Sequence, residues 1–360
     1  MKTLLFYINA INGGGAERVI LQLAHHFADI GYRSVLVTSF VDEGKEYDIP
    51  QNVIRLSIEQ EEIKQSRIKR NFSRITKLRR FIKQETPVAV VSFMAEPNFR
   101  ALIATLGLRT KRIISVRNDP KHEYSGKLGK FIGKYILPLA DGCVFQTEEA
   151  KAWFPKRLQR KSKVILNDVK EEFFEVHREK TNNVVSIGRL SKQKNHSLLI
   201  DAFSLIAKKY PDEKLLLFGE GILENDLKQK IKSLGLQEQV MLIGQTNNVA
   251  DVLKEAKIFV LSSDYEGMPN CLMEALAAGV PCISTDCPCG GPKEIIDNGN
   301  NGILVPIQDP DAMCQALDKL LSDIEYAEAI GKTAKESALR FHPNKIFMEW
   351  KSYVEEVINR

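Results

Sequence analysis

Residues 184–209 read VVSIGRLSKQKNHSLLIDAFSLIAKK, and this stretch indicates the fold class of the whole chain. It begins with a β-branched run at 184–187, continues through a polar loop at 188–195, and ends in a helical apolar pattern at 196–209. A short buried strand followed by a loop and an amphipathic helix makes a βα unit. Such units build parallel sheets, so the same pattern is expected on either side of it.

The same alternation runs through both halves of the chain. Strands are predicted at residues 4–8, 34–38, 88–92, 112–116, 142–146, 184–187, 214–218, 241–243, 258–261, 282–284 and 302–305. Helices are predicted between them, for example at residues 16–30, 69–84, 196–209 and 223–234. This order predicts an α/β protein with two doubly wound, Rossmann-like parallel-sheet domains facing a central cleft.

The length of 360 residues suits two domains of ordinary size. We expect an N-terminal acceptor- and membrane-facing domain at 1–170 and a C-terminal donor domain at 171–342. A last helix at 343–360 is expected to cross back to the first domain. Ligands of open parallel sheets bind beyond the carboxyl ends of the strands, so the strand-to-helix loops are the places to look for function.

The composition excludes several classes of protein. Hydrophobic residues make up 44% and charged residues 27%, which is ordinary for a globular chain and excludes disordered and collagen-like sequences. No apolar run reaches the length of about 18 residues that a transmembrane helix needs. The apolar start is predicted to be a first strand rather than a signal peptide, so we expect a cytoplasmic protein with six reduced cysteines. Cys287 and Cys289 form the only close pair, and no further ligands accompany them, so no metal site is predicted.

The two halves differ in charge. Residues 1–170 carry 30 Lys and Arg against 17 Asp and Glu, whereas residues 171–360 carry 21 against 29. The first half is therefore strongly basic, and we expect it to face an anionic partner.

The first loop of interest follows the first predicted strand and reads NGGGAER at 12–18. Glycines let the backbone approach an anion closely, and the N-terminus of the next helix presents N–H groups to it. The dinucleotide fingerprint G-x-G-x-x-G is absent here. Alone, this loop is also compatible with a tight turn that binds nothing.

The second loop, GRLSKQKN at 188–195, places Arg189 and Lys194 five residues apart before a helix. A guanidinium fork and an ammonium charge at that place suit a diphosphate. The alternative is a pair of solvated surface charges, although the surrounding half of the chain is acidic.

The third loop, SSDYEGMPN at 262–270, leads into a helix that carries Glu274. Glu266 and Glu274 are separated by seven residues, so one lies in the loop and the other within the first turns of the helix. A carboxylate in the helix can bind both hydroxyls of a ribose, and the one in the loop can reach the next group along, a sugar ring. Gly267 and neighbouring N–H groups can hold phosphate oxygens. Stabilisation of the helix dipole would explain Glu274, but it would not explain the loop around Glu266.

Together these motifs resemble those of the retaining glycosyltransferases of family 4, which have the GT-B fold. The resemblance rests on GGGAER at 13–18, GRLSKQKN at 188–195, the E-x7-E segment EGMPNCLMEA at 266–275, and GGPKEII at 290–296, in that order over nearly the whole chain. The chain is most similar to bacterial enzymes that extend lipid-linked oligosaccharides, including N-acetylgalactosaminyl transferases.

The resemblance implies roles for individual residues. Arg189 and Lys194 would bind the diphosphate of a UDP-sugar, and Glu274 would bind its ribose. Glu266 would contact the sugar ring, and the catalytic residues would be Glu266, Arg189 and Lys194. The remaining residues expected at the donor site are Gly14, Gly15, Gly188, Gly267, Met268, Pro269, Asn270, Gln245 and Asn248. Gly219, Glu220 and Gly221 would line the same cleft, and Gly13 would share the role of Gly14 and Gly15. The residues expected near the acceptor or the sugar are Glu17, Arg117, Asn118 and His122.

The resemblance also implies a reaction without a cofactor or an essential metal. Negative charge that develops on the leaving diphosphate would be stabilised by the two cations and by helix N–H groups. The segment Asp309-Pro310-Asp311 has the form of a metal-binding D-x-D motif, but it precedes a helix and is predicted to be a cap. The configuration at the sugar would be retained by front-face attack, with no protein nucleophile.

A basic amphipathic helix is predicted within residues 63–83, which contain nine basic residues and no acidic ones. Its apolar positions are Ile68, Phe72, Ile75, Leu78 and Ile82. Lys69, Arg70, Arg74 and Lys77 are expected to contact the anionic inner face of the plasma membrane. Packing on the sheet with a solvated charged face is the alternative; nucleic acid is not expected, because no accompanying motif for it is present.

The leading hypothesis is a peripheral membrane glycosyltransferase of bacterial surface polysaccharide or glycoprotein glycan assembly. It would transfer a hexose or N-acetylhexosamine, with N-acetylgalactosamine favoured, from a UDP-sugar to a polyprenyl-diphosphate-linked glycan. The alternatives are transfer to a soluble or simple lipid acceptor, a nucleotide-sugar epimerase of the same fold, and a non-catalytic binding protein.

Overall fold

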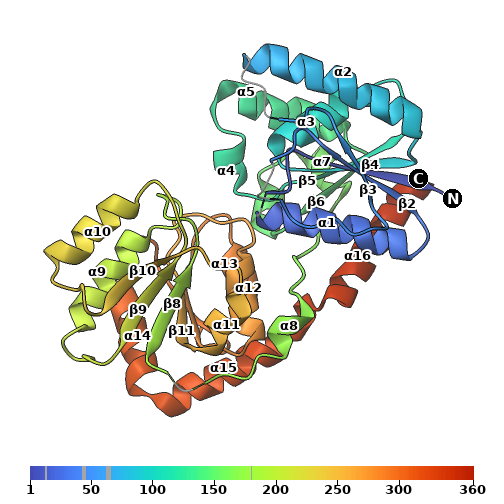
Figure 1. Cartoon of the computed structure of the whole chain (residues 1–360). Helices are drawn as coiled ribbons and strands as arrows, with labels where there is room; N and C mark the ends of the chain where they lie inside the picture. Colours follow the sequence, from blue (N-terminus) through green and yellow to red (C-terminus); the bar gives the residue numbers. More distant parts are fainter. Residues whose placement is uncertain (13, 43–45, 62–65, 180) are drawn as a thin grey trace. The chain divides into compact units, whose positions relative to one another are not determined.

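A computed structural model describes the chain except for residues 13, 43–45, 62–65 and 180, and it leaves out the side chain of residue 67. The chain divides into two compact units (Figure 1). Unit 1 contains Met1–Asn167 and Asn344–Arg360, and unit 2 contains Asp168–Pro343. Each unit is built on its own parallel β-sheet, with helices beside it.

The sheet of unit 1 has seven strands, all paired in parallel. In spatial order they are β3 (Ile54–Ser57), β2 (Arg33–Thr38), β1 (Thr3–Ile8), β4 (Ala89–Phe93), β5 (Lys111–Ser115), β6 (Gly142–Phe145) and β7 (Ser162–Val164). The strand order reverses between β1 and β4, where Leu5 pairs with Val35 on one side and with Val90 on the other. Ligands of doubly wound sheets bind at such a reversal.

The five strands predicted in the first half are confirmed, but β3 and β7 were not predicted. β3 reads IRLS and β7 reads SKV, and neither strand contains a buried residue. Both lie at the edges of the sheet, where a strand needs no continuous apolar run. Their short, polar sequences therefore lack the pattern that marks a central strand.

The helices of unit 1 include two long predicted ones, α1 and α2, which begin and end within two residues of the predicted bounds. The complete set is α1 (Gly15–Asp29), α2 (Arg67–Glu85), α3 (Ala95–Ala104), α4 (Pro120–Glu123), α5 (Gly126–Phe131), the turns η1 (Ile132–Ile136) and η2 (Leu137–Leu139), α6 (Glu148–Ala152), α7 (Lys156–Gln159) and α16 (Pro343–Asn359). The buried residues of α1 recur at helical spacing and pack on the sheet from Val19 to Phe27.

Helix α16, drawn in red in Figure 1, completes the core of unit 1 although it comes last in the chain. The indole of Trp350 stacks on Phe93 at the end of β4, with ring centroids 5.6 Å apart. The hydroxyl of Tyr353 accepts a hydrogen bond from the backbone N–H of Cys143 in β6 at 2.7 Å. Both side chains are almost fully buried, and burial of each aromatic ring contributes roughly 1.5–3 kcal/mol.

The sheet of unit 2 has six parallel strands, and all six were predicted. In spatial order they are β10 (Val240–Gly244), β9 (Lys214–Phe218), β8 (Asn183–Ile187), β11 (Ala256–Leu261), β12 (Cys282–Thr285) and β13 (Ile303–Val305). The helices are α8 (Glu171–Phe174), α9 (His196–Ile206), α10 (Glu224–Ser233), α11 (Val249–Lys254), α12 (Asn270–Ala277), α13 (Gly291–Ile295), α14 (Pro310–Ser322), α15 (Ile324–Ala338) and the turn η3 (Leu339–Phe341). The order reverses between β8 and β11, and the second and third loops follow these two strands.

Candidate active site

The loops after β8 and β11 are joined by several hydrogen bonds. The amide of Asn195 donates to Asp264 at 2.9 Å, while its oxygen accepts from the N–H of Leu198 and so caps α9. The hydroxyl of Ser262 donates to the carbonyl oxygen of Lys194 at 2.9 Å. These neighbouring loops therefore form one support, as expected for strands on either side of a topological reversal.

Lys194 and Glu266 form an ion pair on this support. The Nζ atom of Lys194 lies 2.6 Å from Oε1 of Glu266, and the two side chains are only 16% and 8% exposed. Burial disfavours the charged amine, but attraction to the Glu266 carboxylate, the nearby Cys271 and the hydrogen bond to Glu266 together outweigh this effect, so the pKa of Lys194 is raised. Two residues predicted to act on the diphosphate and on the sugar are thus brought into direct contact, with Lys194 held as a cation.

The Glu266 carboxylate is fixed by its own loop and by the loop after β12. The hydroxyl of Ser263 donates to Oε1 of Glu266 at 2.6 Å. The backbone of Glu266 pairs with Pro288 and Cys289, at 2.7 and 3.0 Å. A Cβ atom on Gly291 would lie 1.9 Å from the carbonyl oxygen of Gly267, so the GGPKEII loop packs against the EGMPN loop closely enough to require glycine. The carboxylate is therefore preorganised by side-chain and backbone contacts.

Gly188 and Gly219 allow the backbone segments after β8 and β9 to pack closely against each other. A Cβ atom on Gly188 would lie 3.1 Å from the Lys194 side chain, and one on Gly219 would lie 2.0 Å from the carbonyl oxygen of Gly188. Gly219 also has a φ of +142°, which favours glycine. Arg189 follows as an exposed residue, in contrast to the mostly buried Lys194. Gly219, Glu220 and Gly221 thus pack on the 188–190 backbone.

Glu274 lies in α12, one turn inside the helix, and is 7% exposed. Gly267, Met268 and Pro269, all buried, precede the helix, and Asn270 is its first residue. The N-terminal N–H groups of α12 therefore follow directly on the loop that holds Glu266, an arrangement suited to phosphate oxygens.

Gln245 and Asn248 are exposed in the loop after β10. The Asn248 side chain caps α11 by accepting a hydrogen bond from the N–H of Asp251 at 3.3 Å. Asn248 therefore has a structural role, and the contact of Gln245 and Asn248 with the donor stays a prediction.

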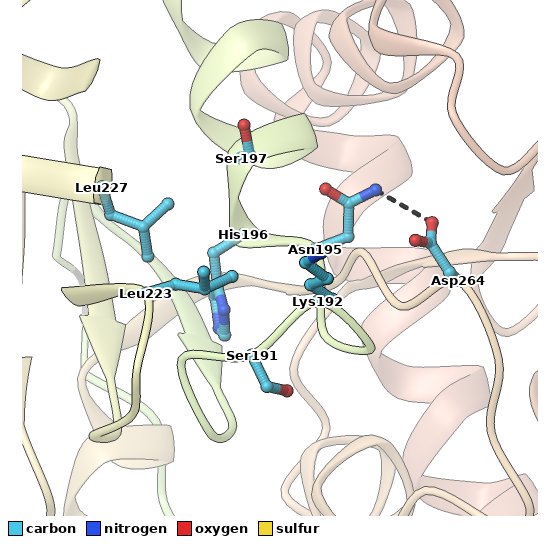
Figure 2. Close-up of a pocket in the computed structure, with 8 residues that line it drawn as sticks. All are labelled: Ser191, Lys192, Asn195, His196, Ser197, Leu223, Leu227 and Asp264. Atoms are coloured by element: carbon cyan, nitrogen blue, oxygen red, sulfur yellow. Dashed lines mark hydrogen bonds between the residues drawn. The ribbon is translucent and has the colours of Figure 1, made fainter. Parts of the chain in front are cut away.

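A cavity of about 280 Å³ lies beside these loops in unit 2 (Figure 2). It is lined by Ser191, Lys192, Asn195, His196, Ser197, Leu223, Leu227 and Asp264. Burial, together with the charge of Lys194, lowers the pKa of His196 to about 4, so this imidazole is neutral at pH 7. The lining includes the Asn195–Asp264 hydrogen bond but none of the predicted donor residues.

In unit 1, Gly14 lies at the N-terminus of α1 and is followed by Gly15; Gly13 lies outside the described residues. The Glu17 carboxylate folds back over Gly14, since a Cβ atom there would lie 2.1 Å from its Oε2. Glu17 thus places negative charge near the free N–H groups of the helix, the position expected for an anionic ligand.

Arg117, Asn118 and His122 follow β5. The Arg117 guanidinium lies over the Phe93 ring, 4.5 Å from its centroid, and donates to Asn167 at 2.6 Å. Arg117 is 7% exposed, whereas the His122 side chain is 52% exposed and pairs with Asp119 at 2.7 Å. Asn118 is partly exposed, and its side chain accepts from the N–H of Asp119.

Two further charged residues of unit 1, Arg100 in α3 and Glu123 in α4, were not predicted. The fully buried Arg100 donates to Asn9 at 2.6 Å and to Asn71 at 2.7 Å, and it also pairs with Glu96. The buried carboxyl group of Glu123 accepts from the N–H of Ala95 at 2.8 Å. Burial raises the pKa of Glu123 to about 7, despite that hydrogen bond. Both side chains join segments distant in sequence, and no local motif signals this.

The structure corrects the predicted membrane face of α2. Arg74 is 1% exposed and pairs with the buried Glu59 at 2.6 Å, because it lies one turn from the buried Leu78 on the inward face. It cannot contact a membrane. Lys69 is exposed, and Arg70 and Lys77 are partly exposed.

The predicted apolar stripe of α2 also divides in two. Leu78 and Ile82 are buried and Ile75 packs against them, whereas Ile68 and Phe72 are 84% and 74% exposed. The C-terminal part of α2 therefore serves the core, and its N-terminal part presents apolar side chains to the outside.

Asp309 caps α14 by accepting a hydrogen bond from the N–H of Ala312 at 2.9 Å, which confirms the predicted cap. None of the six cysteines, all of which are described, forms a disulfide bond. Among the residues that the structure describes, no three potential metal ligands gather, and no helix is long and apolar enough to cross a bilayer.

Two family models match the chain. The model of glycosyltransferases group 1 matches residues 168–337, and that of Glycosyltransferase Family 4 matches residues 13–172. A Methanocaldococcus jannaschii protein described as an uncharacterized glycosyltransferase is 31% identical over 79% of this chain and 83% of its own length.

Two Campylobacter jejuni relatives match over nearly the full length. One, 28% identical over 100% of both chains, is GalNAc-alpha-(1->4)-GalNAc-alpha-(1->3)-diNAcBac-PP-undecaprenol alpha-1,4-N-acetyl-D-galactosaminyltransferase. The other, also 28% identical over 98% of this chain and 100% of its own, is an N-acetylgalactosamine-N,N'-diacetylbacillosaminyl-diphospho-undecaprenol 4-alpha-N-acetylgalactosaminyltransferase.

Solved structures support the fold. Anabaena HepE in complex with UDP and glucose superimposes with a TM-score of 0.82 at 16% identity, covering 98% of this chain and 99% of that one. Sucrose-phosphate synthase from Thermosynechococcus elongatus gives a TM-score of 0.86 at 17% identity, covering 100% of both. The two parallel-sheet domains are thus those of the GT-B fold, and with both family models matched the chain belongs to glycosyltransferase family 4.

Proposed function

We propose that this glycosyltransferase moves an N-acetylhexosamine, with N-acetylgalactosamine favoured, from a UDP-sugar to a polyprenyl-diphosphate-linked glycan, with retention of configuration. The observation that carries the proposed reaction is the buried Lys194–Glu266 pair at the ends of β8 and β11. The Campylobacter relatives, which act on undecaprenol-linked glycans, support the acceptor class because they match nearly the whole chain.

In the proposed reaction, the bond between the sugar C1 and the diphosphate breaks, and negative charge develops on the leaving UDP. Lys194, Arg189 and the N–H groups at the start of α12 stabilise this charge. Glu266, held by Ser263, positions the sugar ring. The acceptor hydroxyl attacks C1 from the face that UDP leaves and transfers its proton to the departing phosphate. The step needs no protein nucleophile and no metal.

The other donor contacts follow from the loops of unit 2. The Glu274 carboxylate binds the ribose hydroxyls, and the backbone near Gln245 and Asn248 receives the uracil. Anabaena HepE, which has the same fold, was solved in complex with UDP, and this supports the choice of UDP as the nucleotide.

The acceptor is assigned to unit 1, at the ends of β1 and β5. The loop with Gly14 and Gly15 approaches the acceptor, with Glu17, Asn118 and His122 near it. The exposed Lys69, together with Ile68 and Phe72, attracts the enzyme to the inner face of the plasma membrane, where a lipid-linked glycan resides.

The test is a transfer assay with purified protein, a panel of UDP- and GDP-sugars, and membrane lipid extract, in the presence of EDTA and analysed by mass spectrometry. We expect one N-acetylhexosamine to be added to a polyprenyl-diphosphate glycan from a UDP-sugar only. Transfer to water or soluble sugars, with none to lipid, would contradict the proposed acceptor. Loss of transfer on adding EDTA would contradict the metal-free reaction.

A further inference from the structure

The segment Gly126–Ile136, which comprises α5 and η1, exposes the large apolar side chains that it carries on one side. Leu128 is 66% exposed, Phe131 51% and Tyr135 53%. All residues of α5 are described, and none of them is buried. Helices of globular units ordinarily bury their apolar face, so this segment lacks a partner for it.

The segment packs against the rest of unit 1 through two glycines instead. A Cβ atom on Gly129 would lie 2.4 Å from the carbonyl carbon of Tyr124, and one on Gly133 would lie 2.8 Å from the Trp153 ring. These glycines are four residues apart and therefore share one helical face. Because the inward face is glycine, Leu128, Phe131 and Tyr135 are not needed for the core.

The exposed apolar residues form a stripe with basic residues beside it. Their spacing of three and four residues puts them on one face, and the rings of Phe131 and Tyr135 lie 5.1 Å apart. Lys127, Lys130 and Lys134 are all exposed, and Nζ of Lys134 lies 5.2 Å from the Tyr135 ring centroid. Residues 125–140 contain no Asp or Glu.

The N-terminal turns of α2 have the same chemistry. Ile68 and Phe72 are exposed there beside Lys69. Helix α3 contacts both α2 and η1, so both segments are attached to one helix of unit 1. Two separate segments that combine exposed apolar groups with Lys match an anionic bilayer, in which apolar groups enter the interface while cations meet headgroups.

We propose that α5 and η1 form a second lipid-docking element, which inserts Leu128, Phe131 and Tyr135 into the interface of an anionic bilayer and works together with the first turns of α2. This inference rests on the proposed function and names the partner of unit 1 more closely. Two lipid-binding elements on unit 1 raise the overall affinity for the bilayer, because binding of the second element is intramolecular once the first is bound. The lipid-linked acceptor is then met by an enzyme anchored at two points.

The test uses the full chain and sedimentation with vesicles of phosphatidylglycerol and phosphatidylethanolamine. The variant Leu128→Ser/Phe131→Ser should bind about tenfold more weakly than the unchanged protein, since two inserting side chains are lost. The matched control is Leu205→Ser/Ile324→Ser in unit 2, where the two residues are 57% and 63% exposed. This control should bind like the unchanged protein. Phe131→Ser alone, with a smaller loss, replaces the double variant if that variant unfolds.

Charge provides the second arm of the test. Lys127→Glu/Lys130→Glu should also weaken binding, and vesicles of phosphatidylcholine alone should bind all proteins weakly. Equal binding by the serine variants of the two units would overturn the proposal. The proposal would also be overturned if the unchanged protein were an oligomer, the α5 serine variant were a monomer, and both bound vesicles equally. The stripe would then be an interface between copies of the chain.

Transfer to a short-chain, detergent-soluble acceptor separates this inference from the proposed function. All α5 variants should retain that activity, since none alters a residue assigned to the donor or acceptor. Absence of this activity in the unchanged protein would contradict the proposed function. The vesicle measurements would still show whether α5 and η1 bind lipid.

Discussion

Charged side chains have different partners in the two units: in unit 2 a cation and a carboxylate from two strand-end loops pair with each other, whereas in unit 1 two arginines contact amides and an aromatic ring. In unit 2, Lys194 and Glu266 from two loops meet at 2.6 Å, and other hydrogen bonds support the same two loops. In unit 1, Arg100 of α3 donates hydrogen bonds to Asn9 and Asn71, and Arg117 lies over the ring of Phe93. Under the proposed function, the Lys194–Glu266 pair of unit 2 acts on the donor, whereas Arg100 and Arg117 hold segments of unit 1 in place.

Removal of Lys194 should have the largest effect on the reaction. In Lys194→Ala the leaving diphosphate loses one of its two cations, and kcat should fall by about 10²–10³-fold. Steady-state transfer kinetics with a UDP-sugar measure this. Lys192→Ala is the matched control, because Lys192 is exposed in the same loop and is not assigned to the donor. An equal loss in both variants would mean that the general charge of the loop matters, rather than the Lys194–Glu266 pair.

Removal of Arg74 should affect stability most. Arg74→Ala leaves the buried Glu59 carboxylate without its cation, and we expect a loss of about 3–5 kcal/mol in the free energy of unfolding. Urea unfolding measures it. The control Arg80→Ala, at an exposed position of the same helix, should change stability little. Unchanged stability of Arg74→Ala would contradict the buried position of this residue.

Glu123 should make unit 1 less stable as the pH rises. Its pKa is about 7 in the folded protein against an ordinary value of 4.5, because burial disfavours the carboxylate. The folded state therefore holds this proton more tightly than the unfolded state, and the contribution to stability is full below pH 4.5 and is lost as the pH rises to about 7. Its size is about 3 kcal/mol.

Glu123→Gln keeps an oxygen for the N–H of Ala95 but cannot ionise. Urea midpoints measured at steps between pH 5 and pH 8 should therefore fall less in this variant than in the unchanged protein. Identical pH profiles for the two proteins would show that the carboxyl group has an ordinary pKa.

The smallest effect is expected at Lys69, on the exposed part of α2. Lys69→Ala should leave stability unchanged and weaken binding to anionic vesicles by about 1 kcal/mol, with the difference shrinking as salt is added. Sedimentation at two salt concentrations measures it. Weaker binding that does not depend on salt would contradict an electrostatic role for Lys69.

The same contrast explains what could be predicted from the sequence. The strands of unit 2 and the residues Lys194, Glu266 and Glu274 lie in local βα patterns, in which a strand, a loop and a helix start occur within a few residues. The edge strands β3 and β7 lack an apolar pattern. Arg74 and Arg100 have long-range partners, in Glu59 and Asn9, so their helical positions look like exposed basic surface until the chain is folded. The exposure of Leu128, Phe131 and Tyr135 likewise depends on the packing of Gly129 and Gly133 against the rest of unit 1, which the local sequence does not indicate.

The proposed transfer with retention is tested by determining the configuration of the transferred sugar. Purified protein and its Glu266→Gln variant are incubated with UDP-N-acetylgalactosamine and a polyprenyl-diphosphate glycan, and the product is examined by mass spectrometry and by NMR of the new anomeric proton. We expect a single N-acetylgalactosamine in the α configuration of the donor, and about a hundredfold less product from Glu266→Gln. A product in the β configuration, or equal turnover by the two proteins, would contradict it.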